Sequence, residues 1–157
     1  MLDAAARARL LATLDLCRSL DDVLLAAMAP LIERFSFTGG SIALMRGEAL
    51  VITAASGPFA AQAIGQSVLL SRSRAWAALK MGAPFLSNDV QGDNLRSTSP
   101  RVRSFLAAPL GPPGAPFGLL EVDSTLPHAF PPDAVSLVMQ VAEVAYPRVL
   151  DFSGSRP

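Results

Sequence analysis

Two carboxylates, Glu121 and Asp123, stand two positions apart in the mainly apolar segment Phe117 to Ser124. Side chains alternate between the two faces of a β-strand. Both carboxylates therefore share one face of a predicted strand, while Leu120 and Val122 share the other. If the apolar face packs on helices, the carboxylates point to the opposite side. There they would provide fixed polar groups for the recognition of a small molecule.

The position of Glu121 in mid-strand raises the question of its partner, because a buried carboxylate is costly unless it meets a cation. The available cationic partners are Arg72, Arg96, Arg101 and Arg103. The alternative is an exposed, loosely paired carboxylate on a wet sheet face. The sequence leaves both interpretations open.

Few other residues have side chains that could react or bind a metal. Cys17 is the only cysteine, which excludes an intrachain disulfide, a Cys-rich zinc site and a two-cysteine redox cycle; we interpret it as a buried apolar residue on a helix. His128 lacks an evident companion ligand, so we interpret it as a solvated loop residue. Asp89 and Asp93 could ligate a hard cation, but their segment lacks the ordered ligand series of a calcium loop. We predict no metal site.

Composition narrows the function classes. Thirteen basic and 13 acidic residues give a formal net charge of +0, and the basic residues are scattered, whereas nucleic-acid binding needs clustered positive charge. The apolar runs end well short of the roughly 20 residues that a membrane span requires. No secretory signal is evident. We therefore expect one cytoplasmic domain, and the many Ala, Arg and Pro residues beside a single Lys are associated with GC-rich bacterial genomes.

Two helices are predicted at the start of the chain. Apolar residues recur at helical spacing from Leu2 to Leu16. A second helix begins after Ser19, which forms the pattern of a capping box with Asp22, and its apolar stripe continues to Phe35. Pro30 lies inside this stripe and removes a backbone donor, so we expect a kink or a break there.

Two strand pairs follow the helices. Ser41 to Met45 and Ala49 to Ala55 flank a tight turn at 46–48 and predict a hairpin. Ser104 to Leu110 and Phe117 to Ser124 flank a Gly/Pro turn and predict a second one. Strand alternation places two residues of the first strand toward the helices and three toward the pocket: Ile42 and Leu44, then Ser41, Ala43 and Met45.

The segments between the hairpins are less regular. Residues 59–71 show no clear period, 71–81 predict a short helix that carries Trp76, and 84–87 predict a short strand. The polar loop Asn88 to Arg101 is long for an apolar domain, which favours a lid or binding loop; it could also be simply mobile.

The last helix is predicted from Pro131 to about Tyr146, before Pro147. Its apolar residues cover well over half of its circumference, more than one sheet contact buries. We expect the surplus to pack on the first helix or on a second subunit, and hence a homodimer through the terminal helices. Residues 151–157 are expected to form a frayed tail.

The ordered set of motifs resembles the GAF domain, a sensory module that holds a small molecule against an antiparallel sheet. The motifs that carry the resemblance are Gly40-Ser-Ile-Ala-Leu, Leu50-Val-Ile-Thr-Ala-Ala-Ser-Gly57, Ala108-Pro109-Leu110, Phe117-Gly118-Leu119-Leu120, and Phe130 with Asp133. The resemblance implies one α+β domain over 1–157, with a core at about 20–146, a leading helix at 1–18 and the tail at 151–157. We expect a GAF/PAS-like antiparallel sheet of about five or six strands. The helices of both termini would cover one face, and ligand-side loops and a short helix the other.

The resemblance also implies which activities are absent. The Asn-Lys, Phe and Asp-Glu signature of cyclic-nucleotide binding is missing. Cys17 lies in the leading helix away from any histidine, unlike the cysteine that holds a bilin. Free methionine sulfoxide reductases are GAF enzymes that depend on more than one cysteine. On this ground we expect no enzyme and no catalytic residues.

The expected function is a non-enzymatic signalling or regulatory domain that binds a small molecule beneath the 88–101 loop. The cofactor is unknown, and the output would go to an effector protein or domain. Predicted ligand-binding residues are Ser41, Ala43, Met45, Arg72, Trp76, Asp89, Asn94, Arg96, Phe105, Glu121 and Asp123. The alternative is a ligand-free GAF-like scaffold for dimerisation or protein docking, with its pocket filled by Trp76, Phe105 and Met45.

Overall fold

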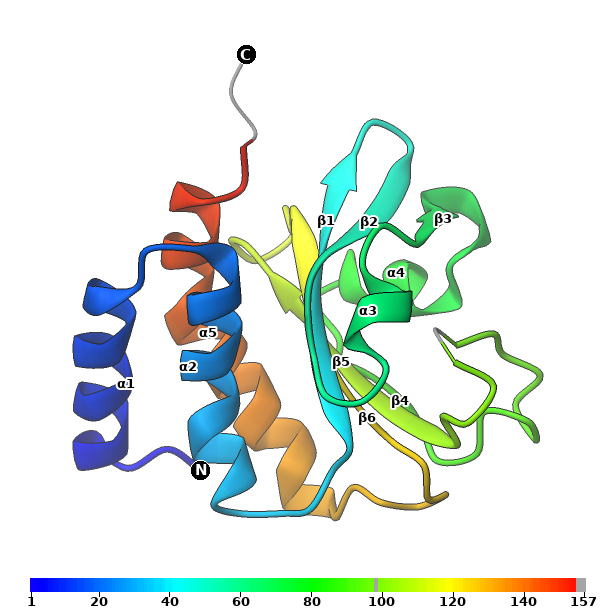
Figure 1. Ribbon diagram of the computed structural model, residues 1–157, viewed down its shortest axis with the longest axis horizontal. Coiled ribbons are helices and arrows are strands. Elements are labelled where there is room, and N and C mark those ends of the chain that lie inside the picture. Colours follow the sequence, from blue (N-terminus) through cyan, green and yellow to red (C-terminus); the bar gives the residue numbers. More distant parts are fainter. Residues whose placement is uncertain (98, 155–157) are drawn as a thin grey trace.

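The computed structural model describes residues 1–97 and 99–154 as an α+β structure built on one six-stranded antiparallel sheet with strand order β3-β2-β1-β6-β5-β4. The strands are β1 (Gly39–Arg46), β2 (Ala49–Ser56), β3 (Ser67–Leu69), β4 (Phe85–Ser87), β5 (Ser104–Leu110) and β6 (Gly118–Ser124). The helices are α1 (Ala4–Leu16), α2 (Leu20–Ile32), α3 (Ala60–Ala63), α4 (Arg74–Leu79) and α5 (Pro132–Asp151). Figure 1 shows α1, α2 and α5 on one side of the sheet and α3 and α4 on the other, which confirms the predicted fold class.

The two predicted hairpins are the two halves of the sheet. β1 and β2 are joined at Gly47, whose φ of +59° favours glycine. β5 pairs with β6, and β6 pairs with β1 at the centre of the sheet. The β1–β2 register shifts between Ile42 and Ala43, so Thr53 has no Cα partner in the ladder and the hairpin is bulged there.

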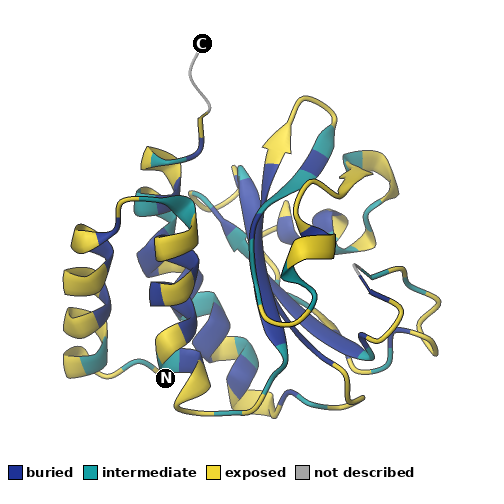
Figure 2. Ribbon diagram, viewed as in Figure 1, coloured by how far each residue is buried: buried dark blue, intermediate teal, exposed yellow. Residues whose placement is uncertain are grey.

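The main core lies between the sheet and the terminal helices, as the dark layer in Figure 2 shows. Strand alternation correctly predicted its sheet side, because Ile42, Leu44, Leu120 and Val122 are each no more than 1% exposed there. Burial of such a side chain stabilises a fold by about 1.5 to 3 kcal/mol. This face is therefore committed to packing, which leaves the other face of the same strands available for recognition.

The wide apolar face of α5 is covered within the chain. α1 packs on α2 and α5 through Leu10 and Leu14. The guanidinium of Arg148 on α5 donates to the carbonyl oxygens of Leu14 at 2.9 Å and of Cys17 at 2.6 Å. These bonds hold the C-terminal end of α1 against α5. The first of the two predicted alternatives thus accounts for the face, and the homodimer stays a prediction.

Pro30 and Pro147 both lie inside helices. α2 continues through Pro30 to Ile32, so the predicted break does not occur at the proline, although the helix ends soon after it. α5 continues through Pro147 to Asp151, because buried Val149 and the bonds of Arg148 hold its last turn against α1.

The predicted frayed tail is also wrong over its first residues. Asp151 belongs to α5, the ring of Phe152 lies 4.6 Å from the Arg148 guanidinium, and Ser153 is buried. Residues 155–157 lie outside the described residues.

Residues 59–71, which had no clear period, contain α3, β3 and a 3₁₀ turn that begins at Leu70. The helix predicted over 71–81 is shorter, because Ser73 accepts from the backbone N–H of Trp76 and starts α4. These short elements cover the sheet face that carries Glu121 and Asp123.

Candidate functional site

Glu121 occupies the middle of the central strand on the face away from the terminal helices. In the ladder it lies opposite Ser41 of β1 and opposite Ala107 of β5. Its side chain is partly buried, and burial raises its pKa to about 8, with the charge of Asp123 adding to the rise. None of the described residues forms an ion pair with it.

Asp123 lies two residues farther along the same face and is 7% exposed. Burial raises its pKa to about 6, while a backbone hydrogen bond from Gly39 acts in the opposite direction. Its Oδ1 atom is buried without a hydrogen-bond partner among the described residues. Buried acceptors are nearly always satisfied in folded proteins, and an orphaned one at a cavity marks a candidate binding group.

The two carboxylates behave as a pair with one charge at neutral pH. Their pKa values of about 8 for Glu121 and about 6 for Asp123 leave the first mainly protonated and the second mainly ionised at pH 7. Burial has moved both titrations away from the ordinary carboxylate range, and this is the perturbation expected of a functional site.

A narrow cavity adjoins Asp123, between β1, β2 and α3. Its residues are Gly40, Ser41, Ala55, Ser56, Phe59, Ala60, Ala63 and Asp123. It measures about 10 Å³, room for roughly one water molecule. Sequence reasoning found Ser41 and Asp123 but missed Ser56, Phe59 and the two α3 alanines, because segment 59–71 has no period that would orient its side chains.

Two apolar clusters flank the carboxylates on this face. Trp76 of α4 packs with Ala43, Ala107 and other residues over one end of the sheet. Phe105, which lies opposite Asp123 in the ladder, packs with residues of the 88–101 loop over the other end. Trp76 and Phe105 are 7% and 5% exposed, whereas Met45 is 39% exposed at the hairpin tip and does not fill the pocket.

An ion pair and a hydrogen bond hold the 88–101 loop at its base. The carboxylate of Asp89 lies 3.6 Å from the guanidinium of Arg103, and the Ser87 hydroxyl donates to Asp93 at 2.6 Å. The pKa of Asp89 is lowered, chiefly because the backbone N–H of Gly92 donates to it. Val90 and Leu95 pack beside Phe105, so the loop covers that end of the face. Thr98 lies outside the described residues.

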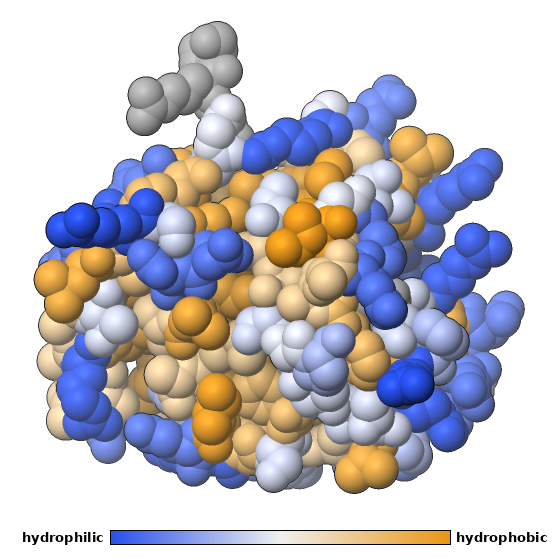
Figure 3. Space-filling view, in the orientation of Figure 1, coloured by the Kyte–Doolittle hydropathy of each residue, from blue (hydrophilic) through white to orange (hydrophobic). Residues whose placement is uncertain are grey.

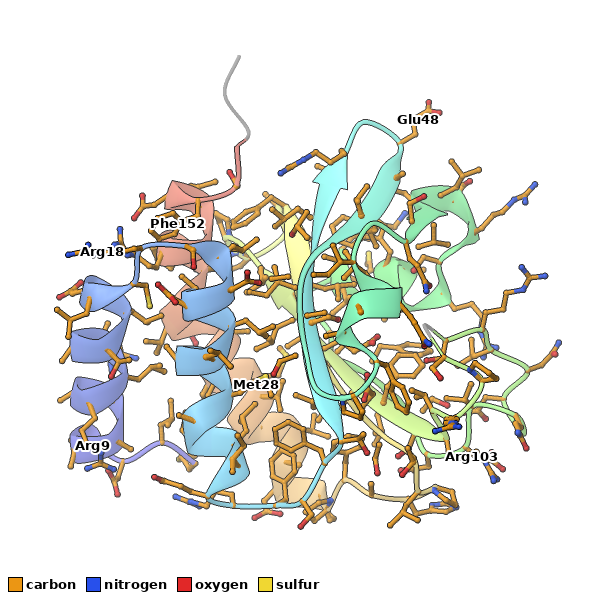
Figure 4. All side chains as sticks on the ribbon, in the orientation of Figure 1. Arg9, Arg18, Met28, Glu48, Arg103 and Phe152 are labelled. Atoms are coloured by element: carbon orange, nitrogen blue, oxygen red, sulfur yellow. The ribbon has the colours of Figure 1, made fainter. Side chains whose placement is uncertain are left out.

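The predicted arginine partners do not reach Glu121. Arg103 pairs with Asp89 and lies out by the loop (Figure 4), and Arg72, Arg96 and Arg101 are exposed. The interpretation of Glu121 as paired with one of them is therefore wrong. Asn94 is also exposed, with a φ of +54° in a turn.

The structure does not bring the other candidates to this site. Cys17 is buried with the terminal helices on the opposite side of the sheet, and burial raises the pKa of its thiol. His128 is exposed in the loop after β6. Within residues 1–97 and 99–154, no cluster of three or more potential metal-binding side chains occurs. No helix in the same ranges is long and apolar enough to cross a bilayer.

A larger but open hollow of about 280 Å³ lies at the ends of β1 and β6. It is lined by Ser36, Phe37, Thr38, Ser124, Thr125, Leu126 and Ala129. No charged side chain lines it.

Known structures share this fold. The GAF domain of the phosphoenolpyruvate-protein phosphotransferase from Acinetobacter aligns with a TM-score of 0.76 and 15% identity, over 96% of this chain and 94% of that one. The GAF domain of a two-component sensor histidine kinase from Bacillus halodurans aligns with a TM-score of 0.70 and 18% identity, over 87% and 97%. A comparison with curated protein sequences found no match.

A third structure corrects the expectation about catalysis. Free methionine-R-sulfoxide reductase from Neisseria meningitidis, solved with its substrate, aligns with a TM-score of 0.75 and 19% identity, over 96% of this chain and 89% of that one. The prediction of no enzyme is thereby contradicted, because chains of this fold include enzymes. The number of cysteines bears only on the methionine sulfoxide reductase reaction and does not exclude other enzymatic reactions.

The sequence itself was also compared with protein families. The profile of the GAF domain matches residues 17–145, which span both hairpins, α2 and most of α5. The chain therefore belongs to the GAF domain family.

Proposed function

We propose that this chain is a regulatory GAF domain that binds a small, positively charged molecule on the sheet face carrying Glu121 and Asp123. The observation that carries the proposal is the pair formed by the partly buried Glu121 and the buried Asp123, which has no cationic partner among the described residues. The ligand would lie beneath α3, α4 and the 88–101 loop.

The energetics of the pair support a cationic ligand. An isolated buried carboxylate is destabilising, so in proteins it is usually paired with a cation or protonated. Here the raised pKa values of Glu121 and Asp123 express that cost. A cationic group placed between β1 and α3 would supply the missing charge and donate to the free Oδ1 atom of Asp123.

Access to the face requires movement, because the cavity is narrow. α3 has only four residues and no side-chain cap, and β3 is exposed along its length. Such segments, with little burial, open at low free energy. We place the entrance at α3 and the adjoining edge of the 88–101 loop.

The strands provide a route to an output. Ser41 and Asp123 face the cavity, while Ile42 and Val122, their immediate neighbours, pack against the terminal helices. Movement of β1 or β6 on binding would therefore shift α2 and α5. An effector protein or domain that reads these helices would receive the signal.

The terminal helices also support the proposed homodimer. Leu25 and Ile32 of α2 are 56% and 63% exposed, and Leu16 of α1 is 80% exposed. Figure 3 shows apolar side chains among charged ones over this side of the molecule. Contact between two such surfaces would bury these leucines and isoleucines.

A ligand-free scaffold is the second candidate function. The observation in its favour is the filling of the face by Trp76 and Phe105, which leaves a cavity of only about 10 Å³. In this case the carboxylates would bind no ligand, and the terminal helices would form the surface for dimerisation or protein docking.

Thermal shifts with small cations and anions separate the two functions. We expect cationic amines to raise the melting temperature of the wild type, because a ligand at 100 times its Kd stabilises by about 2.7 kcal/mol. Glu121→Gln/Asp123→Asn should lose this response, and the matched control Glu48→Gln, in the exposed β1–β2 turn, should keep it. Equal shifts with anions, or a response that survives in the double variant, would overturn the proposal. Native mass spectrometry of the purified protein would report a retained molecule and the subunit number together.

A further inference from the structure

The cavity beside Asp123 has the features of a built subsite. Asp123 is more than nine-tenths buried, lines the cavity and has an unpartnered Oδ1 atom. We infer that this cavity receives a primary ammonium group, which is the cationic head of the ligand. The inference rests on the proposed function and specifies the chemistry of its ligand.

The size of the cavity selects the head group. Its volume of about 10 Å³ is close to the minimum of about 10 to 15 Å³ that holds one water molecule. A primary ammonium group is nearly the size of a water molecule, whereas a guanidinium or a trimethylammonium is several times larger. Of these cations, the primary ammonium group is the one whose size matches the cavity.

The lining supplies acceptors for an ammonium group. Such a group has three donors and no acceptor. Asp123 contributes its carboxylate, whose Oδ1 atom has no hydrogen-bond partner among the described residues, and the hydroxyl group of Ser41 can accept from another donor. On the other side, Phe59, Ala60 and Ala63 form an apolar wall. In this setting charge-assisted hydrogen bonds are strong.

The walls contain no competing cation. β2 (Ala49–Ser56) and α3 (Ala60–Ala63) have no charged residue, and the one basic residue of β1, Arg46, donates to the carbonyl oxygen of Ser153 beyond the far end of α5. Arg103 is held by Asp89. With Glu121 mainly protonated and Asp123 mainly ionised at neutral pH, the pair carries one negative charge, which one ammonium group neutralises.

The test uses three simple probes at equal ionic strength in sodium chloride: ammonium chloride, methylamine hydrochloride and tetramethylammonium chloride. Two-dimensional ¹H–¹⁵N NMR spectra follow the backbone amides of Gly40, Ser56 and Ala60 at the cavity. We expect saturable shifts of these amides with ammonium and methylamine and none with tetramethylammonium. Asp123→Asn should weaken the response at least about tenfold, whereas the control Glu48→Gln, in the exposed β1–β2 turn, should retain it.

The outcomes distinguish this inference from the proposed function. Equal shifts with tetramethylammonium in the wild type, or an undiminished response in folded Asp123→Asn protein, would overturn the ammonium subsite and leave a less selective cation site. The comparison of probes needs no variant, so it holds even if Asp123→Asn does not fold. If none of the three cations shifts any residue on this face, both proposals fail.

Discussion

Glu121 lies directly opposite Ser41 in the β6–β1 ladder, on the side of the sheet that the terminal helices do not touch. The carboxyl group therefore has a hydroxyl-bearing residue as its cross-strand neighbour, and the charge of Asp123 helps to raise its pKa. Ionisation of both carboxyl groups on this face costs free energy, and the same groups are available for ligand recognition. It also makes the stability of the domain depend on pH.

Replacement of Glu121 by glutamine is expected to stabilise the domain at alkaline pH. The pKa of Glu121 rises from 4.5 to about 8 on folding, so between these values the folded state binds a proton that the unfolded state has released. Where the folded state binds more protons, the free energy of unfolding falls as the pH rises. At pH 9 Glu121→Gln should gain about 1 to 3 kcal/mol, less than the full shift implies because the side chain is partly exposed.

Urea unfolding of both proteins at pH 5 and pH 9 measures this effect. Glu48→Gln, in the exposed turn, is the matched control and should follow the wild type at both values. A Glu121→Gln variant that gains nothing at pH 9 would show that the carboxylate is well solvated.

Amine binding is expected to weaken in acid. Asp123 has a pKa of about 6, and only its ionised form attracts an ammonium group. Of the other groups on the cavity's elements, Glu121 is mainly protonated and Arg46 bonds elsewhere. The apparent Kd for methylamine should therefore rise about tenfold from pH 7.5 to pH 5, since each unit below the pKa reduces the ionised fraction about tenfold. NMR titrations at the two pH values measure it, and an unchanged Kd would place the cation away from Asp123.

Loss of the Arg148 side chain is expected to release α1 from α5. Its guanidinium donates to the carbonyl oxygens of Leu14 and Cys17, and hydrogen bonds to a charged group contribute about 1.5 to 3 kcal/mol. Arg148→Met should lower the free energy of unfolding by about that amount and increase amide hydrogen exchange in α1. Arg9→Met, on the exposed side of α1, should change stability by less than about 0.5 kcal/mol. Unchanged exchange in α1 would contradict the role given to Arg148.

A side chain at Gly118 is expected to disrupt the centre of the sheet. A Cβ atom there would overlap the carbonyl oxygen of Ala43 and press on Leu44. Because the obstacle is backbone in the β1–β6 ladder, Gly118→Ala should cost about 2 to 4 kcal/mol. Gly47→Ala meets no atom within 4 Å and has a φ of +59°, so it should cost only about 1 to 2 kcal/mol from backbone strain. Denaturant midpoints rank the two variants, and the reverse order would argue against the β1–β6 register.

The proposed homodimer makes a separate prediction. Leu25→Glu/Ile32→Glu places two charges on the exposed face of α2 and should convert a dimer to a monomer in light scattering. Leu126→Glu, at a loop residue that is 66% exposed, is the control and should leave the assembly unchanged. A wild-type protein that is monomeric at high concentration would remove the homodimer from the proposed function.

Local sequence pattern was sufficient for the long elements and for the faces of the strands. Alternation in 118–124 and 39–46 separated Ile42 and Val122, which pack on helices, from Ser41 and Asp123, which do not. The capping pattern at Ser19 correctly predicted the start of α2. The Ser19 hydroxyl accepts a hydrogen bond from the backbone N–H of Asp22. These features depend on residues that are close together in the sequence, so the local sequence pattern is enough to predict them.

Only the tertiary structure decided how the face is closed. Phe59 and the α3 alanines line one cavity with Asp123. The arginines that the sequence offered to Glu121 are paired with Asp89 or exposed to solvent. Likewise Pro147 stays within α5 because α1, more than 130 positions earlier, binds Arg148. Contacts between distant segments set both results, and no local period records them. The sequence thus determined that two carboxylates share a face, and the packing of distant segments determined that they remain without a cation.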